Sequence, residues 1–270
     1  MSDWRNISLW MDQLDEPLIP RAALSGDLQA DVVIVGAGYT GLWTAYYLKQ
    51  QSPSLRIVIL EAQTAGFGAS GRNGGWLMGN LLGEDRLLAG LTPTQRHDAY
   101  ALLHAIPDEV GDVLQREQIA CDYRKAGVLY CAARYPEQRV RLQAQLQALR
   151  GEGHGEADYR WLDTSELNEQ LRIATPYGAL FSPHCATIHP ARLVRGLARC
   201  VERMGVTMKI ADPELDRLHG IVSTLDYNVL LADPAGIVVA RRGAIAPETV
   251  ALGADHGGDL RIVEHASIGG

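Results

Sequence analysis

The feature that most constrains this chain is a glycine-rich turn between an apolar run and a helical pattern. Asp31-Val32-Val33-Ile34-Val35 leads directly into Gly36-Ala37-Gly38-Tyr39-Thr40-Gly41. A second apolar run, Leu55 to Leu60, ends at Glu61, twenty residues after Gly41. A strand, a G-x-G-x-x-G turn, a helix, a second strand and an acidic residue in this order predict a dinucleotide-binding βαβ unit. The alternative is an ordinary βαβ unit whose turn happens to be rich in glycine.

Each residue type in the turn has a physical task. Gly36 permits the tight turn, Gly38 has no Cβ to obstruct a pyrophosphate, and Gly41 lets the helix pack close to the strand. We expect the phosphates to lie at the helix N-terminus, where N–H groups and the positive end of the dipole favour negative charge. Glu61 is placed to accept hydrogen bonds from the adenosine ribose. Its charge disfavours a 2′-phosphate, so NADP is not expected.

A second glycine-rich run separates flavin from nicotinamide binding. Gly66-Phe67-Gly68-Ala69-Ser70-Gly71-Arg72-Asn73-Gly74-Gly75 follows Glu61 closely, and an NAD-binding unit has no need of it. FAD is a longer dinucleotide that such a run could bind. Ser70, Arg72 and nearby backbone amides would contact its pyrophosphate and the part of the molecule that leads to the flavin. The alternative is a flexible surface loop. The predicted FAD-binding residues are Gly36, Gly38, Tyr39, Thr40, Gly41, Glu61, Ala69, Ser70, Arg72, Asn73, Gly74 and Gly75.

These stretches resemble a known family. ADVVIVGAGYTGLWTAYYLKQ, LRIVILEA and GFGASGRNGG are similar to the FAD-dependent oxidoreductases of the D-amino-acid-oxidase superfamily, and most similar to its γ-glutamylputrescine oxidase-like branch. The resemblance extends over about residues 8–208. It implies a flavoenzyme that removes a hydride from the carbon next to an amine nitrogen of a small amine or amino acid. The resulting imine would be hydrolysed, and oxygen or another acceptor would reoxidise the flavin.

The resemblance also implies a fold and a domain order. We expect an α/β protein with a Rossmann-like FAD-binding domain of the glutathione-reductase type and an inserted, mainly antiparallel substrate domain. The expected divisions are an N-terminal arm at 1–30, a first FAD-binding part at 31–118, a substrate-domain segment at 119–188, a return to the FAD-binding domain at 189–210, and a divergent tail at 211–270.

Composition agrees with a globular enzyme and excludes other classes. Hydrophobic residues make up 47% and charged residues 21% of the 270 positions, and the net charge of −7 comes without a basic tract that would suggest nucleic acid. The N-terminus has no signal-peptide pattern, and no apolar run is long enough to span a membrane. The four cysteines form no C-x-x-C pair, so neither a zinc site nor a disulfide framework is indicated. We therefore expect a cytoplasmic protein; the oligomeric state stays open.

Local patterns predict the remaining elements. Pro17 and Pro20 discourage regular structure in the arm. The predicted elements are a helix over 93–119 interrupted or offset at Pro107, a pair of strands at 121–123 and 127–132, a polar helix over 136–150, a short helix after the capping box that begins at Asp163, a strand at 179–181, a helix over 190–204 and a strand over 206–210.

Several polar residues have competing interpretations. His184, Cys185 and His189 suggest a metal cluster, but the adjacent prolines favour loop anchoring, and we predict no metal site. Tyr123, Arg124, Tyr130 and Tyr177 fall where the family's substrate sheet would face the flavin, although packing is the commoner fate of such residues. No catalytic residue is assigned, because hydride loss from a neutral amine needs no dedicated base.

After residue 210 the family pattern is not recognisable. The stretch from Pro213 to Ala240 predicts a helix to Thr224, strands at 228–231 and 237–240 and a D-x-x-G turn, which weakly resembles the opening of a GAF-type sensor domain. A frameshift, a fusion or a fragment would each produce such an ending. Three hypotheses stay open: an FAD-dependent amine or amino-acid oxidoreductase lacking part of the family fold and weakly active, a non-catalytic nucleotide-binding remnant, and a fusion with a regulatory sensor.

Overall fold

The computed structural model describes residues 4–25, 28–174, 176–210, 231–232, 238–240 and 260–262. The chain divides into two compact units, one of residues 1–74 and 190–270 and the other of residues 75–189. Each unit is described by itself. The predicted division into an arm, two FAD-binding parts, a substrate segment and a tail stays a prediction.

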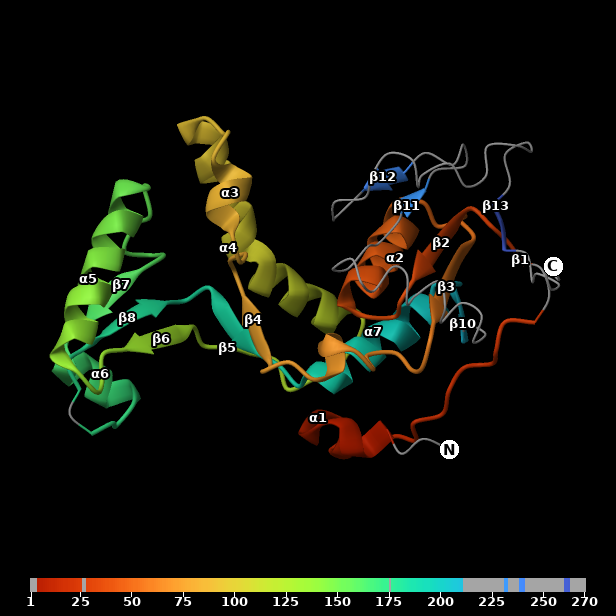
Figure 1. The fold of residues 1–270 in the computed structure, drawn as a ribbon, viewed down its shortest axis with the longest axis horizontal. Coiled ribbons are helices and arrows are strands. Elements are labelled where there is room, and N and C mark those ends of the chain that lie inside the picture. Colours follow the sequence, from red (N-terminus) through yellow and green to blue (C-terminus); the bar gives the residue numbers. More distant parts are fainter. Residues whose placement is uncertain are drawn as a thin grey trace, which may run out of the picture. The chain divides into compact units, whose positions relative to one another are not determined.

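The first unit is built on a parallel three-stranded sheet in the order β10-β3-β2. The βαβ start consists of β2 (Val32–Val35), α2 (Tyr39–Gln51) and β3 (Ile57–Glu61), and the later pair is α7 (Pro190–Arg203) and β10 (Thr207–Ile210). All five residues of β3 are buried, as expected for the central strand of a parallel sheet. Figure 1 shows β2, β3 and β10 side by side, with α2 and α7 packed against each other.

The N-terminal arm is more ordered than its prolines suggest. It contains a 3-10 turn, η1 (Trp4–Ile7), the short helix α1 (Leu9–Asp12) and β1 (Leu28–Ala30). Ser8 caps α1 by accepting from the Met11 amide, and Met11 is fully buried against Leu14 and Ala191. The arm was expected to be irregular because of Pro17 and Pro20, and this holds only between α1 and β1.

The same arm covers an edge of the sheet. Ala23 bridges to Ile210 in parallel, because the Leu24 amide donates to the Ile210 carbonyl at 2.9 Å and the Ile210 amide donates to the Ala22 carbonyl at 3.0 Å. The backbone groups at the end of β10 are therefore paired, and this part of the sheet edge is not open to another strand.

The described residues after 210 form three short strands. β11 (Leu231–Ala232) pairs antiparallel with β12 (Val238–Ala240), and β13 (Leu260–Ile262) pairs antiparallel with β1. The strands predicted at 228–231 and 237–240 overlap β11 at Leu231 and β12 at 238–240, and their other residues lie outside the described residues. The helix predicted over 213–224 lies outside the described residues.

The second unit contains two antiparallel three-stranded sheets. One has the order β4-β9-β5 and the other the order β6-β8-β7. Their strands are β4 (Trp76–Met78), β5 (Arg124–Lys125), β6 (Val128–Cys131), β7 (Arg160–Leu162), β8 (Ala179–Ser182) and β9 (Cys185–Thr187). The prediction of a mainly antiparallel insert is confirmed.

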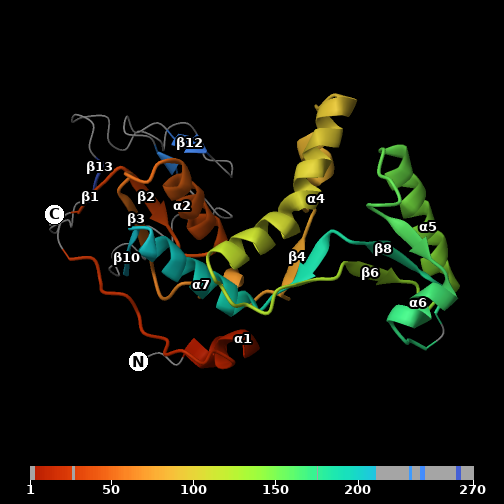
Figure 2. The same cartoon turned by 180° about the vertical axis from the view of Figure 1, so that it is seen from behind.

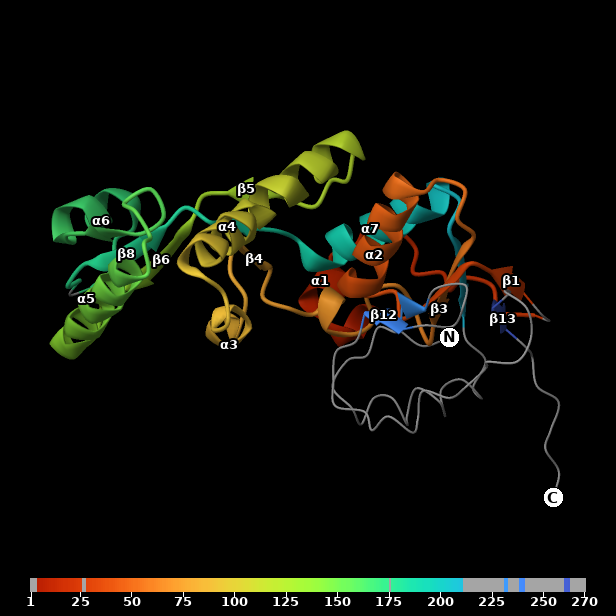
Figure 3. The same cartoon turned by 90° about the horizontal axis from the view of Figure 1, so that it is seen from above.

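Four helices accompany these sheets in the second unit: α3 (Glu84–Leu88), α4 (Pro93–Arg116), α5 (Pro136–Gly151) and α6 (Thr164–Gln170). Figure 3 shows α5 and α6 beside β6 and β8. The predicted capping box is confirmed, since Asp163 accepts from the amides of Ser165 and Glu166 while the Glu166 side chain accepts from the Asp163 amide.

Two local predictions are refined by the structure. The helix expected to be interrupted or offset at Pro107 is continuous, and Figure 2 shows a bend in α4. Proline lacks the N–H for one bond of the helical ladder, so a long, packed helix bends without ending. The strands predicted at 121–123 and 127–132 do not pair with each other, because β5 begins at Arg124 and pairs with β9 while β6 pairs with β8.

None of the helices within the described residues is both long and apolar enough to cross a membrane. All four cysteines are free thiols, and Cys121, Cys185 and Cys200 are buried.

Candidate functional site

The first glycine-rich turn has the backbone that its sequence predicts. Gly36 has a φ of +96°, a conformation that side chains disfavour. A Cβ on Gly41 would lie 2.2 Å from the Gly36 carbonyl oxygen and 3.0 Å from Cγ2 of Ile34. Glycine at these two positions therefore lets α2 begin immediately above the end of β2.

Glu61 closes this turn from the end of β3. Its Oε2 accepts from the Ala37 amide at 2.7 Å and its Oε1 accepts from the Gln63 amide at 3.0 Å, and the residue is 9% exposed. The carboxylate therefore stabilises the turn itself, a role that the sequence did not reveal. A carboxylate has about four acceptor positions, so two remain for other donors.

The second glycine-rich run docks on the first. Ser70 Oγ accepts from the Tyr39 amide at 2.9 Å, and the Gly66 amide donates to the Ala37 carbonyl at 3.0 Å. A Cβ on Gly38 would lie 3.0 Å from Ser70 Oγ. The absence of a side chain at Gly38 thus makes room for Ser70 at the N-terminus of α2, which the sequence alone did not indicate.

The rest of the second run is held by its own short-range contacts. Residues 69–71 form the 3-10 turn η2 (Ala69–Gly71), and Asn73 Nδ2 donates to the carbonyls of Ala69 and Ser70 at 3.2 and 3.1 Å. The exposed Arg72 donates to the Gly68 carbonyl, and its guanidinium lies 5.2 Å from the centre of the Phe67 ring. The structure brings the predicted residues up to Gly74 together in the first unit, whereas Gly75 begins the second unit.

Residues of the N-terminal arm form hydrogen bonds with the second glycine-rich run. Ser8 Oγ donates to the Gly71 carbonyl at 3.1 Å, and Trp10 Nε1 donates to the Asn73 carbonyl at 2.8 Å. A Cβ on Gly71 would lie 2.6 Å from Cε of Met11. Sequence reasoning missed these arm residues, although Ser8 before an apolar run is a helix-start signal.

A second contact fixes the arm to α7. Glu16 accepts from Nε of Arg195 and from Nη1 of Arg199, and the buried Arg195 also donates to Thr64 Oγ1 at 3.1 Å. Burial raises the pKa of Glu16, but the hydrogen bonds from the two arginines outweigh it and hold the pKa below its ordinary value. The arm is therefore anchored by charge as well as by apolar packing.

The donor set at the two runs fits a phosphate-containing ligand. The N-terminus of α2 carries the positive end of a helix dipole, and Gly36, Gly38 and Gly41 are three positions at or just before it that have no side chain. The Ser70 hydroxyl accepts one bond and keeps its own proton to donate, while the Arg72 guanidinium is exposed. Hydrogen-bond donors and positive charge are what a pyrophosphate requires.

A separate polar cluster lies in the second unit. His104 on α4, His154 and Asp158 between α5 and β7, and His184 before β9 come together there. Asp158 Oδ1 lies 3.0 Å from His184 Nε2 and 3.3 Å from His104 Nδ1. The sequence suggested His184 as a metal ligand, but together with Cys185 and His189. It did not group His184 with His104, His154 and Asp158, because these lie on segments far from His184 in the chain. In the structure the His184 ring instead stacks on that of His104 at 3.8 Å.

Burial sets the protonation of this cluster. It lowers the pKa of His104 to about 4, with the charge of His184 acting in the same direction and Asp158 opposing it. Burial likewise lowers the pKa of His154, against the attraction of Asp158. Burial raises the pKa of Asp158, but the hydrogen bonds from the Gly155 amide and His184 leave it below its ordinary value. These pKa shifts favour neutral imidazoles at His104 and His154 and an ionised carboxylate at Asp158.

The four residues considered for substrate binding are placed as follows. Tyr123 packs on α4 and donates to the Pro107 carbonyl at 2.7 Å, and Tyr130 is half-buried on β6. Arg124 is exposed on β5, and the Tyr177 amide donates to the Ala132 carbonyl at 2.7 Å. The Tyr123 ring packs against Gly111 of α4, so its position has a structural explanation.

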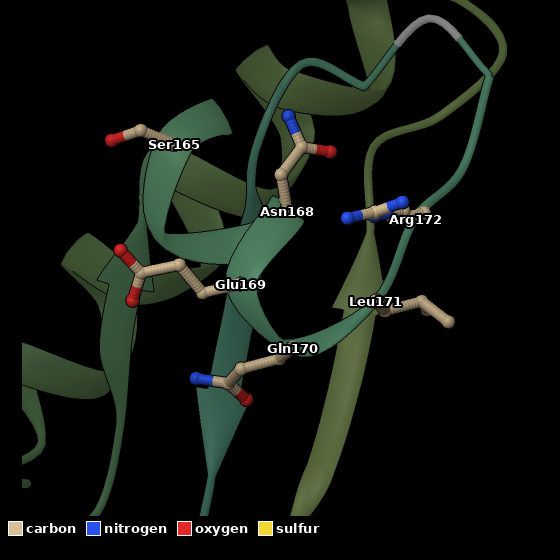
Figure 4. A pocket seen from close by; sticks show the side chains of 6 residues that line it. All are labelled: Ser165, Asn168, Glu169, Gln170, Leu171 and Arg172. Carbon is tan, nitrogen blue, oxygen red and sulfur yellow. The ribbon is translucent and has the colours of Figure 1, made fainter.

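A surface pocket lies at the C-terminal end of α6. It is lined by Ser165, Asn168, Glu169, Gln170, Leu171 and Arg172. Figure 4 shows that these side chains point in different directions, so the pocket presents no convergent set of polar groups. We therefore do not regard it as the functional site.

Comparison with known proteins gives the following matches. Residues 31–242 match the profile of a family described as FAD dependent oxidoreductase, so the match runs past residue 210, where the sequence alone showed no family pattern. The γ-glutamylputrescine oxidoreductase of Escherichia coli K12 is 31% identical over 190 residues, which are 69% of this chain and 42% of that protein. A probable oxidoreductase of Haemophilus influenzae, OrdL, is 26% identical over 70% of this chain and 43% of its own length.

Solved structures match the fold. An L-amino acid deaminase from Proteus myxofaciens has a TM-score of 0.55 at 19% identity, covering 73% of this chain and 41% of that one. A glycine oxidase from Bacillus cereus has a TM-score of 0.52 at 18% identity, covering 67% and 47%. The chain spans less than half the length of the relatives described here.

Proposed function

Because the chain belongs to the family of FAD-dependent oxidoreductases, we propose that its first unit binds FAD and that the protein oxidises the C–N bond of a small amine or amino acid. The observation that carries this proposal is the docking of the two glycine-rich runs through Ser70 and the Tyr39 amide at the start of α2. This docking brings together groups from both glycine-rich runs that would bind phosphate. An NAD-binding unit needs only the first of these runs.

The proposed FAD-binding set follows from these contacts. The N-terminus of α2, with Tyr39 and Thr40, and the Ser70 hydroxyl hold the pyrophosphate, and Glu61 uses its remaining acceptor positions for the ribose. The remaining proposed members are Gly36, Gly38, Gly41, Ala69, Arg72, Asn73, Gly74 and Gly75. When bound, FAD supplies the acceptor for a hydride from the substrate carbon next to nitrogen. This chain's residues bind and orient the cofactor, and none is assigned as an acid or base.

The substrate class rests on sequence similarity. The 31% identical relative is named for γ-glutamylputrescine, an amine, which supports an amine in preference to an alcohol or a sugar. We further propose that the second unit, which includes the predicted segment 119–188, supplies the substrate-binding part. Peroxide release with a panel of polyamine derivatives and amino acids tests this proposal, and turnover confined to alcohols would remove it.

A non-catalytic nucleotide-binding protein is the second candidate. It is favoured by the three parallel strands that the described part of the first unit contains, fewer than a doubly wound dinucleotide domain uses. The colour of the purified protein and its bleaching by amines separate the two candidates, because only the oxidoreductase is both yellow and reduced by substrate.

The cofactor assignment is tested by titrating the purified chain with FAD, NAD and NADP. We expect FAD to bind most tightly and Ser70→Ala and Glu61→Ala each to weaken it by about 1–3 kcal/mol, the cost of a lost hydrogen-bond partner. Asp12→Asn, an exposed acid in the same unit, is the control and should leave affinity unchanged. Since Glu61 also accepts from the Ala37 amide, unfolding without FAD must be measured for each variant. Tighter binding of NADP than of FAD would refute the assignment.

A further inference from the structure

The polar cluster of the second unit has the composition of a metal site. One ligand atom from each of His104, His154 and Asp158 lies within 4.8 Å of the other two. The two histidines are 9% and 7% exposed, and the Asp158 side chain is 27% exposed. Two buried imidazoles and one partly exposed carboxylate thus lie close together. This cluster is independent of the glycine-rich runs and of the function proposed for them.

The loop that carries two of these ligands is held in place by hydrogen bonds. Arg150 donates to the carbonyl of His154 at 2.8 Å and to that of Tyr159 at 2.6 Å, so one guanidinium fixes both ends of the segment. Asp158 Oδ2 accepts from the Gly155 amide at 2.9 Å. The carboxylate therefore presents Oδ1 to the histidines with little freedom, as a preorganised ligand requires.

His184 supports the carboxylate from outside the group of three. Its Nε2 lies 3.0 Å from Asp158 Oδ1, and its ring is parallel to that of His104 within 8°. Carboxylates that bind metals are commonly oriented by a neighbouring hydrogen-bond donor of this kind. Tyr100 packs edge-on against the His154 ring at 4.4 Å and limits where that ring can turn.

We propose that His104, His154 and Asp158 bind a divalent transition-metal ion of the zinc type, with His184 positioning Asp158. Two nitrogens and one oxygen suit Zn²⁺, Co²⁺ or Ni²⁺, whereas Ca²⁺ and Mg²⁺ prefer oxygen ligands. Ligand atoms around a tetrahedral Zn²⁺ are about 3.3 Å apart, which follows from bond lengths near 2.0 Å. The pair His104 Nδ1 and Asp158 Oδ1, at 3.3 Å, has this spacing, and a ligand atom of His154 lies within 4.8 Å of the ligand atoms of both.

Three protein ligands leave a fourth position for water. The ion would fasten the segment between α5 and β7 to α4, two parts of the second unit that the sequence separates by about fifty residues. The site adds a tertiary link to this unit and requires no flavin.

The experiment uses the chain without a histidine tag, stripped with chelator and titrated with Zn²⁺ against a zinc-binding dye. We expect one Zn²⁺ per chain, a rise in melting temperature with Zn²⁺, and a Co²⁺ complex whose visible spectrum shows no thiolate charge transfer. His104→Gln, His154→Gln and Asp158→Asn should each weaken binding at least tenfold, and His184→Gln should weaken it by about 10–100-fold. His97→Gln, an exposed histidine on the same helix, is the matched control and should bind like the parent chain.

Three results would overturn the proposal. They are the absence of stoichiometric binding in the folded parent chain, unchanged affinity in the variant that combines all three substitutions, and a Co²⁺ spectrum that indicates ligation by cysteine. Circular dichroism of each variant shows whether it folds. The titration of the parent chain decides the question even where a variant does not.

Discussion

At the scale of single residues, Gly41 is a position where a methyl group has no space. Its Cβ would lie 2.2 Å from the carbonyl oxygen of Gly36, which belongs to the same turn. Neither the helix nor the turn can shift enough to relieve this clash without a cost in energy. We expect Gly41→Ala to lower the free energy of unfolding by about 1–3 kcal/mol, as overpacking does, and to weaken FAD binding. Urea unfolding and FAD titration measure the two effects.

Gly68→Ala is the control for this prediction. A Cβ on Gly68 has no neighbour within 4 Å, and the residue has a φ of −72° that alanine adopts freely. Its unfolding free energy should change by no more than about 0.5 kcal/mol. Equal effects of the two substitutions would show that the turn tolerates a side chain at Gly41.

At the scale of elements, the link between the N-terminal arm and α7 depends on one carboxylate. Glu16→Gln leaves the buried Arg195 without its charged partner, and we expect a loss of about 1–3 kcal/mol at neutral pH. The pKa of Glu16 is lowered in the folded protein, so its contribution is present above the ordinary value of 4.5 and is lost as the pH falls through the folded value. The difference between the parent chain and the variant should therefore shrink below pH 4.5.

Urea unfolding followed by tryptophan fluorescence at neutral and acidic pH measures this effect. Asp15→Asn removes the neighbouring acid, whose side chain is 95% exposed, and should have little effect at either pH. A pH-independent difference for Glu16→Gln would mean that its charge is not what anchors the arm.

At the scale of the whole molecule, we predict that the chain of residues 1–270 binds FAD weakly and self-associates. Among the described strands β2 pairs only with β3, and Val35 at its end is 49% exposed although it is apolar. A strand edge without a second hydrogen-bonded partner among the described residues and exposed apolar surface favour association. Light scattering after size exclusion and FAD titration test this, and a yellow, monomeric protein with stoichiometric FAD and amine-dependent bleaching would contradict it.

The sequence by itself determined the features that depend on neighbouring residues. The βαβ start, the positive φ at Gly36 and the cap at Asp163 follow from short-range sterics and hydrogen bonding, which a local pattern records directly. The same locality explains why the family could be recognised from the glycine-rich runs. It also explains the error at β5, where the pairing partner overrides the local signal.

Only the tertiary structure decided which distant groups meet. Ser70 reaches the Tyr39 amide across thirty-one residues, Glu16 reaches Arg195 across 179, and Asp158 contacts histidines on both sides of it in the chain. No periodicity encodes these contacts, because each depends on how separate elements are folded against one another. The sequence thus identified the kind of cofactor. The fold revealed the hydrogen bonds that join the two glycine-rich runs, and it separately revealed the histidine cluster, which no sequence motif indicates.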